Sequence, residues 1–111
     1  MIRPLEDEAQ LAEALAAPQA VIYKHSPRCG ACVAAEREVT FFAEGHPDVP
    51  VYRLDVVARG RLAQAIARTL GIPHESPQVI LLSAGKTIWS ASHWEVRALD
   101  LEARVQRQPA G

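Results

Sequence analysis

A pair of cysteines that directly follows an apolar run constrains this chain more than any other feature. The run Val21–Tyr23 leads into a turn at Ser26–Pro27, and Cys29 and Cys32 come next. These are the two cysteines of the whole chain. We expect both in the first turn of a helix, where Cys32 shares a face with Cys29 and can close a disulfide with it. A C-x-x-C pair placed after a strand is typical of redox motifs.

The expected helix start also predicts which thiol is reactive. Unpaired N–H groups and the helix dipole favour negative charge at a helix N-terminus, so the pKa of Cys29 should be lowered and its thiolate stabilised. Arg28 adds positive charge beside it, and Lys24 and His25 do the same if the turn folds back. Cys32 lies one turn deeper in the helix, and we expect it to be less exposed and less acidic.

Length and composition predict one globular domain over residues 1–111, with a frayed tail at 107–111. The chain is 49% hydrophobic and 23% charged, which is typical of folded rather than disordered chains. A net charge of −1 gives no electrostatic reason to expect nucleic acid or acidic lipid as a partner. No apolar run approaches the length needed to cross a membrane, so we expect no membrane partner.

The first residues favour a cytoplasmic location. Met1–Glu8 contains three acidic residues where a secretory signal would need an apolar segment. Because thiols are kept reduced in the cytosol, a C-x-x-C pair there is more often catalytic or metal-binding than a structural disulfide.

Periodicity and turn residues predict alternating helices and strands. Helices are expected over 5–17, from Ser26–Pro27 to Glu44, over 59–70 and from Ser92 onward. Strands are expected over 20–24, 49–57, 79–82 and 87–90, with a candidate short strand at 2–3. In the cysteine-bearing helix, Val33 and Phe41 are expected to face the core, and Leu99 to belong to the apolar stripe of the last helix. Ser92 and Glu95 read as a capping box.

This order predicts an α/β fold with a central mixed sheet of about four strands flanked by helices. A βαβ unit with C-x-x-C after its first strand comes first. A proline then leads into an antiparallel hairpin. That combination is typical of the thioredoxin-like fold.

Three segments carry a closer resemblance: Lys24–Cys29, His74–Gln78 and Ser92–Trp94. Together they resemble the monothiol bacilliredoxins, thioredoxin-like proteins of the bacillithiol system, over most of the chain. The resemblance implies removal of bacillithiol from mixed disulfides with proteins, with Cys29 as the attacking thiol and Pro77 as a cis-proline beside it. It implies S-thiolated client proteins as partners, bacillithiol as a co-substrate and no bound metal or organic cofactor. A flavin disulfide reductase is a candidate for recycling.

The chain departs from this family at Cys32, because the family typically has a lone cysteine in this loop. A second thiol permits resolution within the protein. Thioredoxin itself fits less well: it has Trp just before its first cysteine and a buried Asp six residues before it, where this chain has Arg28 and Tyr23. Ala31 stands in place of its intervening proline.

Five further residues are candidates for substrate binding: Arg28, Ser76, Pro77, His93 and Trp94. A cis Ser76–Pro77 bond would turn the backbone of Ser76 toward the sulfur, where an extended substrate could pair with it. Pro77 also has a purely structural interpretation as a strand-entry proline. His93 and Trp94 either pack against the domain or form a ligand wall at a helix N-terminus, which binds carboxylates. Arg28 would anchor carboxylates through its charge.

The sequence thus predicts a thiol–disulfide oxidoreductase acting through Cys29, with Cys32 or a second small thiol as the resolving group. One alternative is a general protein-disulfide reductase. Another is a non-enzymatic zinc or scaffold protein, in which the two cysteines and two of His25, His74 and His93 would bind the metal.

Overall fold

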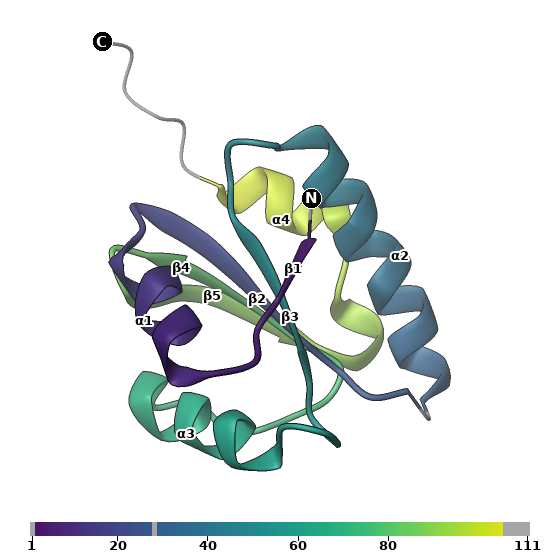
Figure 1. Cartoon of the computed structure of the whole chain (residues 1–111). Coiled ribbons are helices and arrows are strands. Elements are labelled where there is room, and N and C mark those ends of the chain that lie inside the picture. The colour runs from purple at the N-terminus through teal and green to yellow at the C-terminus, as the bar shows by residue number, and fades with distance from the viewer. Residues whose placement is uncertain (1, 28, 106–111) are drawn as a thin grey trace, which may run out of the picture.

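The computed structural model describes residues 2–27 and 29–105, and its elements alternate as the sequence predicts (Figure 1). In chain order they are β1 (Ile2–Pro4), α1 (Glu8–Ala16), β2 (Gln19–His25), α2 (Gly30–Gly45), β3 (Val51–Asp55), α3 (Gly60–Leu70), β4 (Gln78–Ser83), β5 (Lys86–Ser92), the 3₁₀ helix η1 (His93–Glu95) and α4 (Ala98–Arg104). Arg28 and the predicted tail at 107–111 lie outside the described residues.

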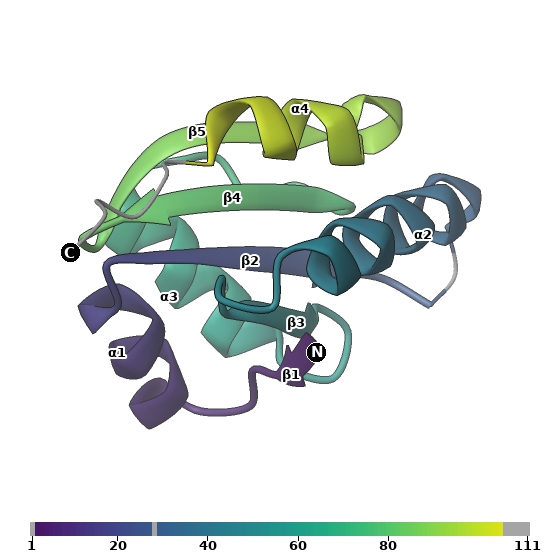
Figure 2. The ribbon, with the colours of Figure 1, turned by 90° about the horizontal axis from the view of Figure 1, so that it is seen from above.

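The strands form one mixed sheet in the order β1-β3-β2-β4-β5. β1, β3 and β2 run parallel, whereas β4 is antiparallel to β2 and β5 is antiparallel to β4. Helices α1 and α3 cover one face of the sheet, and α2 and α4 cover the other (Figures 1 and 2). The predicted α/β class is confirmed. The sheet has five strands rather than about four, because Ile2–Pro4 pairs with β3 along its edge.

Strand β2 is the centre of the core, and all seven of its residues are buried. Successive side chains of a strand point to opposite faces. Val21 and Tyr23 therefore pack under α2 and α4, while Ala20 and Ile22 pack under α1 and α3. The strand ends at His25, four residues before Cys29, so the core fixes the point from which the cysteine-bearing turn begins.

Two apolar residues of α2 do not face the core, in contrast to the prediction. Val33 is 56% exposed and Phe41 is 64% exposed. The buried stripe instead runs through Ala35, Val39 and Phe42, which recur at intervals of four and three residues and pack on the sheet.

The predicted helix start at Ser92 is wrong. β5 continues through Ser92, which pairs with Gln78, and the side chain of Ser92 caps no helix. The three-residue η1 follows, and α4 begins only at Ala98. Leu99 is consequently 76% exposed, and Leu101 takes the buried position on α4.

Turn residues set the remaining boundaries. Gly71 ends α3 with a left-handed φ of 66°, as expected of a glycine after a helix. In the β4–β5 turn, Gly85 has a φ of 80°, and a Cβ there would lie 2.8 Å from the carbonyl oxygen of Leu15. Within the part of the chain that the structure describes, no helix combines the length and the apolar character needed to span a bilayer.

Candidate active site

The two cysteines lie where the chain leaves the end of β2 and enters the start of α2. Cys29 is the N-cap residue of α2, with extended backbone angles, and is partly exposed. Cys32 is fully buried one turn further on, and its N–H donates to the carbonyl oxygen of Cys29 at 3.1 Å. Both are free thiols. The pair therefore has one accessible sulfur and one sheltered sulfur.

The pKa of the Cys29 thiol is lowered from its ordinary value. The main cause is a hydrogen bond from the Cys32 thiol, followed by hydrogen bonds from the backbone N–H groups of Cys32 and Ala31. These N–H groups belong to the first turn of α2, and the shift has the direction predicted from the helix start. The Cys32 thiol, which the sequence argument did not invoke, contributes more than they do.

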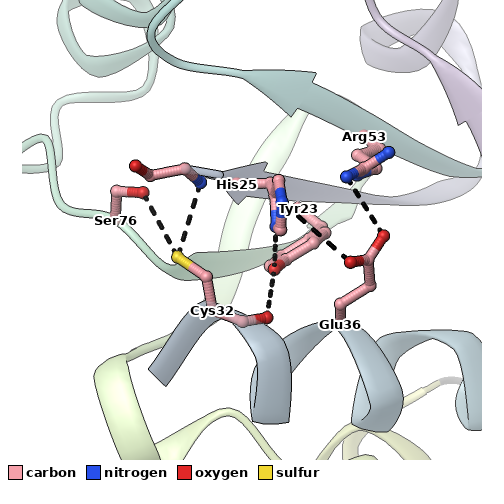
Figure 3. A network of polar contacts seen from close by, with 7 residues as sticks. Tyr23, His25, Cys32, Glu36, Arg53 and Ser76 are labelled. Atoms are coloured by element: carbon pink, nitrogen blue, oxygen red, sulfur yellow. Dashed lines mark hydrogen bonds and ion pairs between the residues drawn. The ribbon is translucent and has the colours of Figure 1, made fainter. Parts of the chain in front are cut away.

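Cys32 shows the opposite shift, because burial raises the pKa of its thiol. Two groups surround this sulfur: the N–H of Ser26 donates to it at 3.4 Å, and the hydroxyl oxygen of Ser76 lies 3.9 Å away (Figure 3). A donor aimed at the sulfur favours the thiolate once it forms. The raised pKa favours the protonated thiol at rest, and the N–H of Ser26 is placed to stabilise the thiolate.

The Ser76–Pro77 peptide bond is cis, the isomer expected from the sequence. Ser76 lies beside Cys32, and the carbonyl oxygen of Pro77 accepts a hydrogen bond from the N–H of His93 at 2.9 Å. The fold thus brings Ser76, Pro77 and His93 to the cysteine turn. The N–H of His93 is engaged in this bond, so it is not free to bind a carboxylate as expected of a helix start at this place. Trp94 follows and is 66% exposed.

A polar network, here called the Tyr23 network, lies under the first turns of α2 and runs from buried residues to partly exposed ones (Figure 3). The Tyr23 hydroxyl donates to the carbonyl oxygen of Cys32 at 3.1 Å and lies 2.8 Å from Nδ1 of His25. Nε2 of His25 is 4.0 Å from Glu36, and Glu36 pairs with Arg53 at 3.1 Å. The network ties β2 and β3 to the helix that carries the cysteines.

A second contact, here called the Lys24 pair, joins the residue between Tyr23 and His25 to an exposed histidine. Lys24 is fully buried, and its Nζ lies 3.2 Å from Nδ1 of His74. Burial lowers the pKa of Lys24 to about 8, against a smaller opposing effect of Glu75. Neither Lys24 nor His25 is among the groups that shift the pKa of either cysteine. The predicted positive charge from these two residues therefore does not act on the thiols.

The zinc alternative lacks a ligand set. Across residues 2–27 and 29–105, no three His, Cys, Asp or Glu side chains are grouped so that they could hold a metal ion. The three candidate histidines face different partners. His25 faces Tyr23 and Glu36, His74 faces Lys24, and His93 faces Glu75 at 3.7 Å.

Sequence reasoning missed the residues that support the cysteine turn. The sequence singles out none of Tyr23, Glu36 and Arg53 as a site residue. A signal existed in the charged and polar residues of β2, because Lys24 and His25 interrupt an otherwise apolar buried strand. Buried polar groups need partners. The partners themselves come from distant parts of the chain.

Comparison with solved structures places this arrangement in the thioredoxin fold. A structure described as having a thioredoxin fold superposes with a TM-score of 0.85 at 23% identity, covering 92% of this chain and 91% of that one. The oxidised form of mitochondrial thioredoxin 3 from Saccharomyces cerevisiae gives a TM-score of 0.73 at 20% identity, covering 92% and 91%. A mutant thioredoxin from Halobacterium salinarum gives 0.74 at 22% identity, covering 97% and 94%.

Residues 3–101 match the family described as monothiol bacilliredoxin BrxC. The match spans nearly the whole chain, so this chain belongs to the monothiol bacilliredoxin family. It is an oxidoreductase-like protein of the thioredoxin fold. The family description is monothiol, whereas this member has a second cysteine beside the first.

Proposed function

We propose that this protein removes bacillithiol from mixed disulfides with client proteins. The observation that carries the proposal is the pair of unlike thiols: Cys29 is accessible with a lowered pKa, and Cys32 is buried beside it with a raised pKa. A nucleophile needs thiolate character and access, and a resolving thiol needs proximity and later deprotonation. Membership of the bacilliredoxin family supports bacillithiol as the small thiol.

The reaction proceeds by two thiolate attacks. The Cys29 thiolate attacks the bacillithiol sulfur of the mixed disulfide, forming a Cys29–bacillithiol disulfide and releasing the client as a thiolate. Cys32 then loses its proton to solvent and attacks the sulfur of Cys29. This forms the Cys29–Cys32 disulfide and expels bacillithiol as a thiolate. Two electrons from an external dithiol or a flavin disulfide reductase return the protein to the dithiol state.

The surroundings of Cys32 suit the second step. The N–H of Ser26, 3.4 Å from the sulfur of Cys32, stabilises the thiolate as it forms. The hydroxyl oxygen of Ser76 lies 3.9 Å from the same sulfur. The cis bond at Pro77 leaves Ser76 next to the reacting atoms, where its backbone can pair with the client chain. His93 supports this loop through its bond to Pro77. Arg28 and Trp94 remain candidates for contact with the small thiol.

Mass spectrometry of trapped protein tests the proposal. After incubation with a client carrying bacillithiol, wild type should be recovered mainly with an internal disulfide, and Cys32→Ser mainly with bacillithiol on Cys29. Cys29→Ser is the matched control and should carry no adduct. Equal adduct in wild type and Cys32→Ser would make the cycle monothiol, with a second small thiol resolving. No adduct in either, together with rapid reduction of insulin, would assign a general protein-disulfide reductase instead.

A further inference from the structure

A surface groove between α2 and the η1–α4 connection lies beside the cysteine-bearing end of α2 and has no role so far. It encloses about 350 Å³. Here called the Arg37–Arg97 groove, it is lined by Ala34, Arg37 and Glu38 from α2 and by Trp94, Val96 and Arg97 from the other wall.

The side chains that line this groove carry a net positive charge, with two guanidinium groups against one carboxylate. Within residues 2–27 and 29–105, neither Arg37 nor Arg97 forms an ion pair, and both side chains are exposed. The one carboxylate in the lining, that of Glu38, accepts a hydrogen bond from the N–H of Ala98 at 2.8 Å and so caps α4. Two guanidinium groups are thus left facing solvent across one opening.

A second groove with two arginines shows the contrast. Between α1 and α3, Arg61 and Arg68 share their opening with Glu6, Asp7 and Glu8. The acidic residues there offset the arginines. The lining of the Arg37–Arg97 groove contains two cations and one carboxylate, a net positive charge that favours an anionic ligand.

Trp94 supplies a flat apolar wall. It is 66% exposed, whereas Val96, two residues later, is 3% exposed. The indole of Trp94 offers a large apolar face against which the body of a ligand can pack. Its position is set by the site itself, because the adjacent His93 has a left-handed φ of 56° and bonds to Pro77.

The groove also lies within reach of the reactive sulfur. Gly30, Ala34 and Glu38 follow one another at intervals of four residues and therefore share a face of α2. This face begins at the residue next to Cys29. At 1.5 Å per residue, Arg37 lies about 12 Å further along the helix axis than Cys29. That span suits a small thiol whose sulfur is bonded to Cys29 and whose far end carries carboxylates.

We propose that the Arg37–Arg97 groove binds the carboxylate-bearing end of a low-molecular-weight thiol while its sulfur reacts with Cys29. The inference rests on the proposed function and deepens it by assigning the residues that select the small thiol. Guanidinium groups pair with carboxylates in a planar, bidentate manner. The face of Trp94 packs against the body of the ligand. Guanidinium side chains thereby take the role that the sequence had given to a helix start at Ser92.

The test compares disulfides that differ in charge. Reduced Cys32→Ser protein is mixed with bacillithiol disulfide, glutathione disulfide or uncharged hydroxyethyl disulfide. In each case the Cys29 thiolate forms a mixed disulfide and expels one thiolate, and the rate is followed by mass. The double variant Arg37→Gln/Arg97→Gln should lower the rate with the two carboxylate-bearing disulfides about tenfold, the usual scale for losing a charged contact. Its rate with hydroxyethyl disulfide should not change.

Arg61→Gln/Arg68→Gln is the matched control, because it removes two exposed arginines from the groove on the opposite face of the sheet. It should leave all three rates unchanged, which separates a local contact from an effect of net charge. Alkylation of Cys29 by neutral iodoacetamide should be equal in all variants if the fold and the thiol are intact. A carboxylate preference that survives Arg37→Gln/Arg97→Gln, or its absence from the parent protein, would overturn the assignment.

The proposed function has a separate readout. Release of a client protein from its bacillithiol mixed disulfide is measured with the wild-type protein. If carboxylate-bearing disulfides react through the two arginines but the client is not released, the groove assignment stands and the proposed function is wrong. Rapid client release by Arg37→Gln/Arg97→Gln, at the wild-type rate, would count against the groove alone.

Discussion

The polar side chains of β2 find their partners in different ways on the two faces of the strand. On the α2 face, the Tyr23 network includes a carboxylate, that of Glu36, which lies between the imidazole of His25 and the guanidinium group of Arg53. On the opposite face, the Lys24 pair sets a buried ammonium group against an imidazole. Consecutive residues of a strand point to opposite faces, so neighbours in sequence serve separate structures. The Tyr23 network supports the helix that carries the cysteines, and the Lys24 pair supports the loop that leads to Ser76.

The difference predicts opposite energetic signs. The buried side chains of Tyr23 and His25 satisfy each other in the Tyr23 network, so removing one should destabilise the fold. Lys24 has a pKa lowered to about 8 by burial, which means that its charged form is disfavoured in the folded state. Removing this charge should therefore stabilise the fold. A residue that costs stability at the edge of a reactive site fits the general trade between stability and function.

The largest expected effect is that of Lys24→Met. Methionine has a similar length and no charge to bury, so the free energy of unfolding at pH 7 should rise by about 2 kcal/mol. The pKa of Lys24 falls from 10.5 in the unfolded chain to about 8 in the fold. Its penalty is therefore full below pH 8 and disappears as the pH rises to about 10.5. Urea unfolding of both proteins should show their difference vanish across that window. Lower stability of Lys24→Met at pH 7 would contradict the comparison.

Tyr23→Phe should have the opposite sign and a somewhat smaller effect. It removes the hydroxyl that bonds both the Cys32 carbonyl oxygen and Nδ1 of His25, and it leaves the buried imidazole nitrogen unpaired. A loss of about 1–2 kcal/mol is expected, measured by urea unfolding at pH 7. The rate of Cys29 alkylation serves as the control and should stay unchanged, because Tyr23 makes no contact with that sulfur. A neutral effect on stability would mean that the network does not hold α2.

These contacts show where sequence reasoning succeeded and where it could not. The C-x-x-C turn, the order of the strands and the glycine that ends α3 follow from local rules of turns and periodicity. The outward orientation of Val33 and Phe41 did not follow from these rules. Helix α2 has a second apolar stripe through Ala35, Val39 and Phe42, and only packing decides which of the two stripes is buried.

The prediction that the last helix starts at Ser92 failed for a related reason. Ser92 has a good local signal for a helix cap, yet it pairs with Gln78 and stays in β5. Tertiary pairing overrode the local signal. The contacts of Lys24 with His74 and of Glu36 with Arg53 join residues far apart in the chain, so only the fold could reveal them.

Acid should weaken both faces of β2 less strongly than these substitutions. Burial lowers the pKa of His25 and of His74, so the folded state favours both imidazoles in the neutral form. Their contribution to stability is complete above the unfolded pKa of about 6.5 and is lost as the pH falls through the lower folded values. The free energy of unfolding should therefore decrease between pH 7 and pH 5. The double variant His25→Gln/His74→Gln should lose less over the same range, and an equal loss would assign the acid sensitivity to other groups.

The smallest effects separate the two faces most sharply, because they are shifts of single histidines. Glu36 raises the pKa of His25, so Glu36→Gln should lower it further and leave His74 unchanged. Lys24 lowers the pKa of His74, so Lys24→Met should raise it and leave His25 unchanged. Both values can be followed by NMR titration of the imidazole signals. A crossed response, in which Lys24→Met shifts His25 or Glu36→Gln shifts His74, would show that the two clusters act as one network through β2 rather than as two.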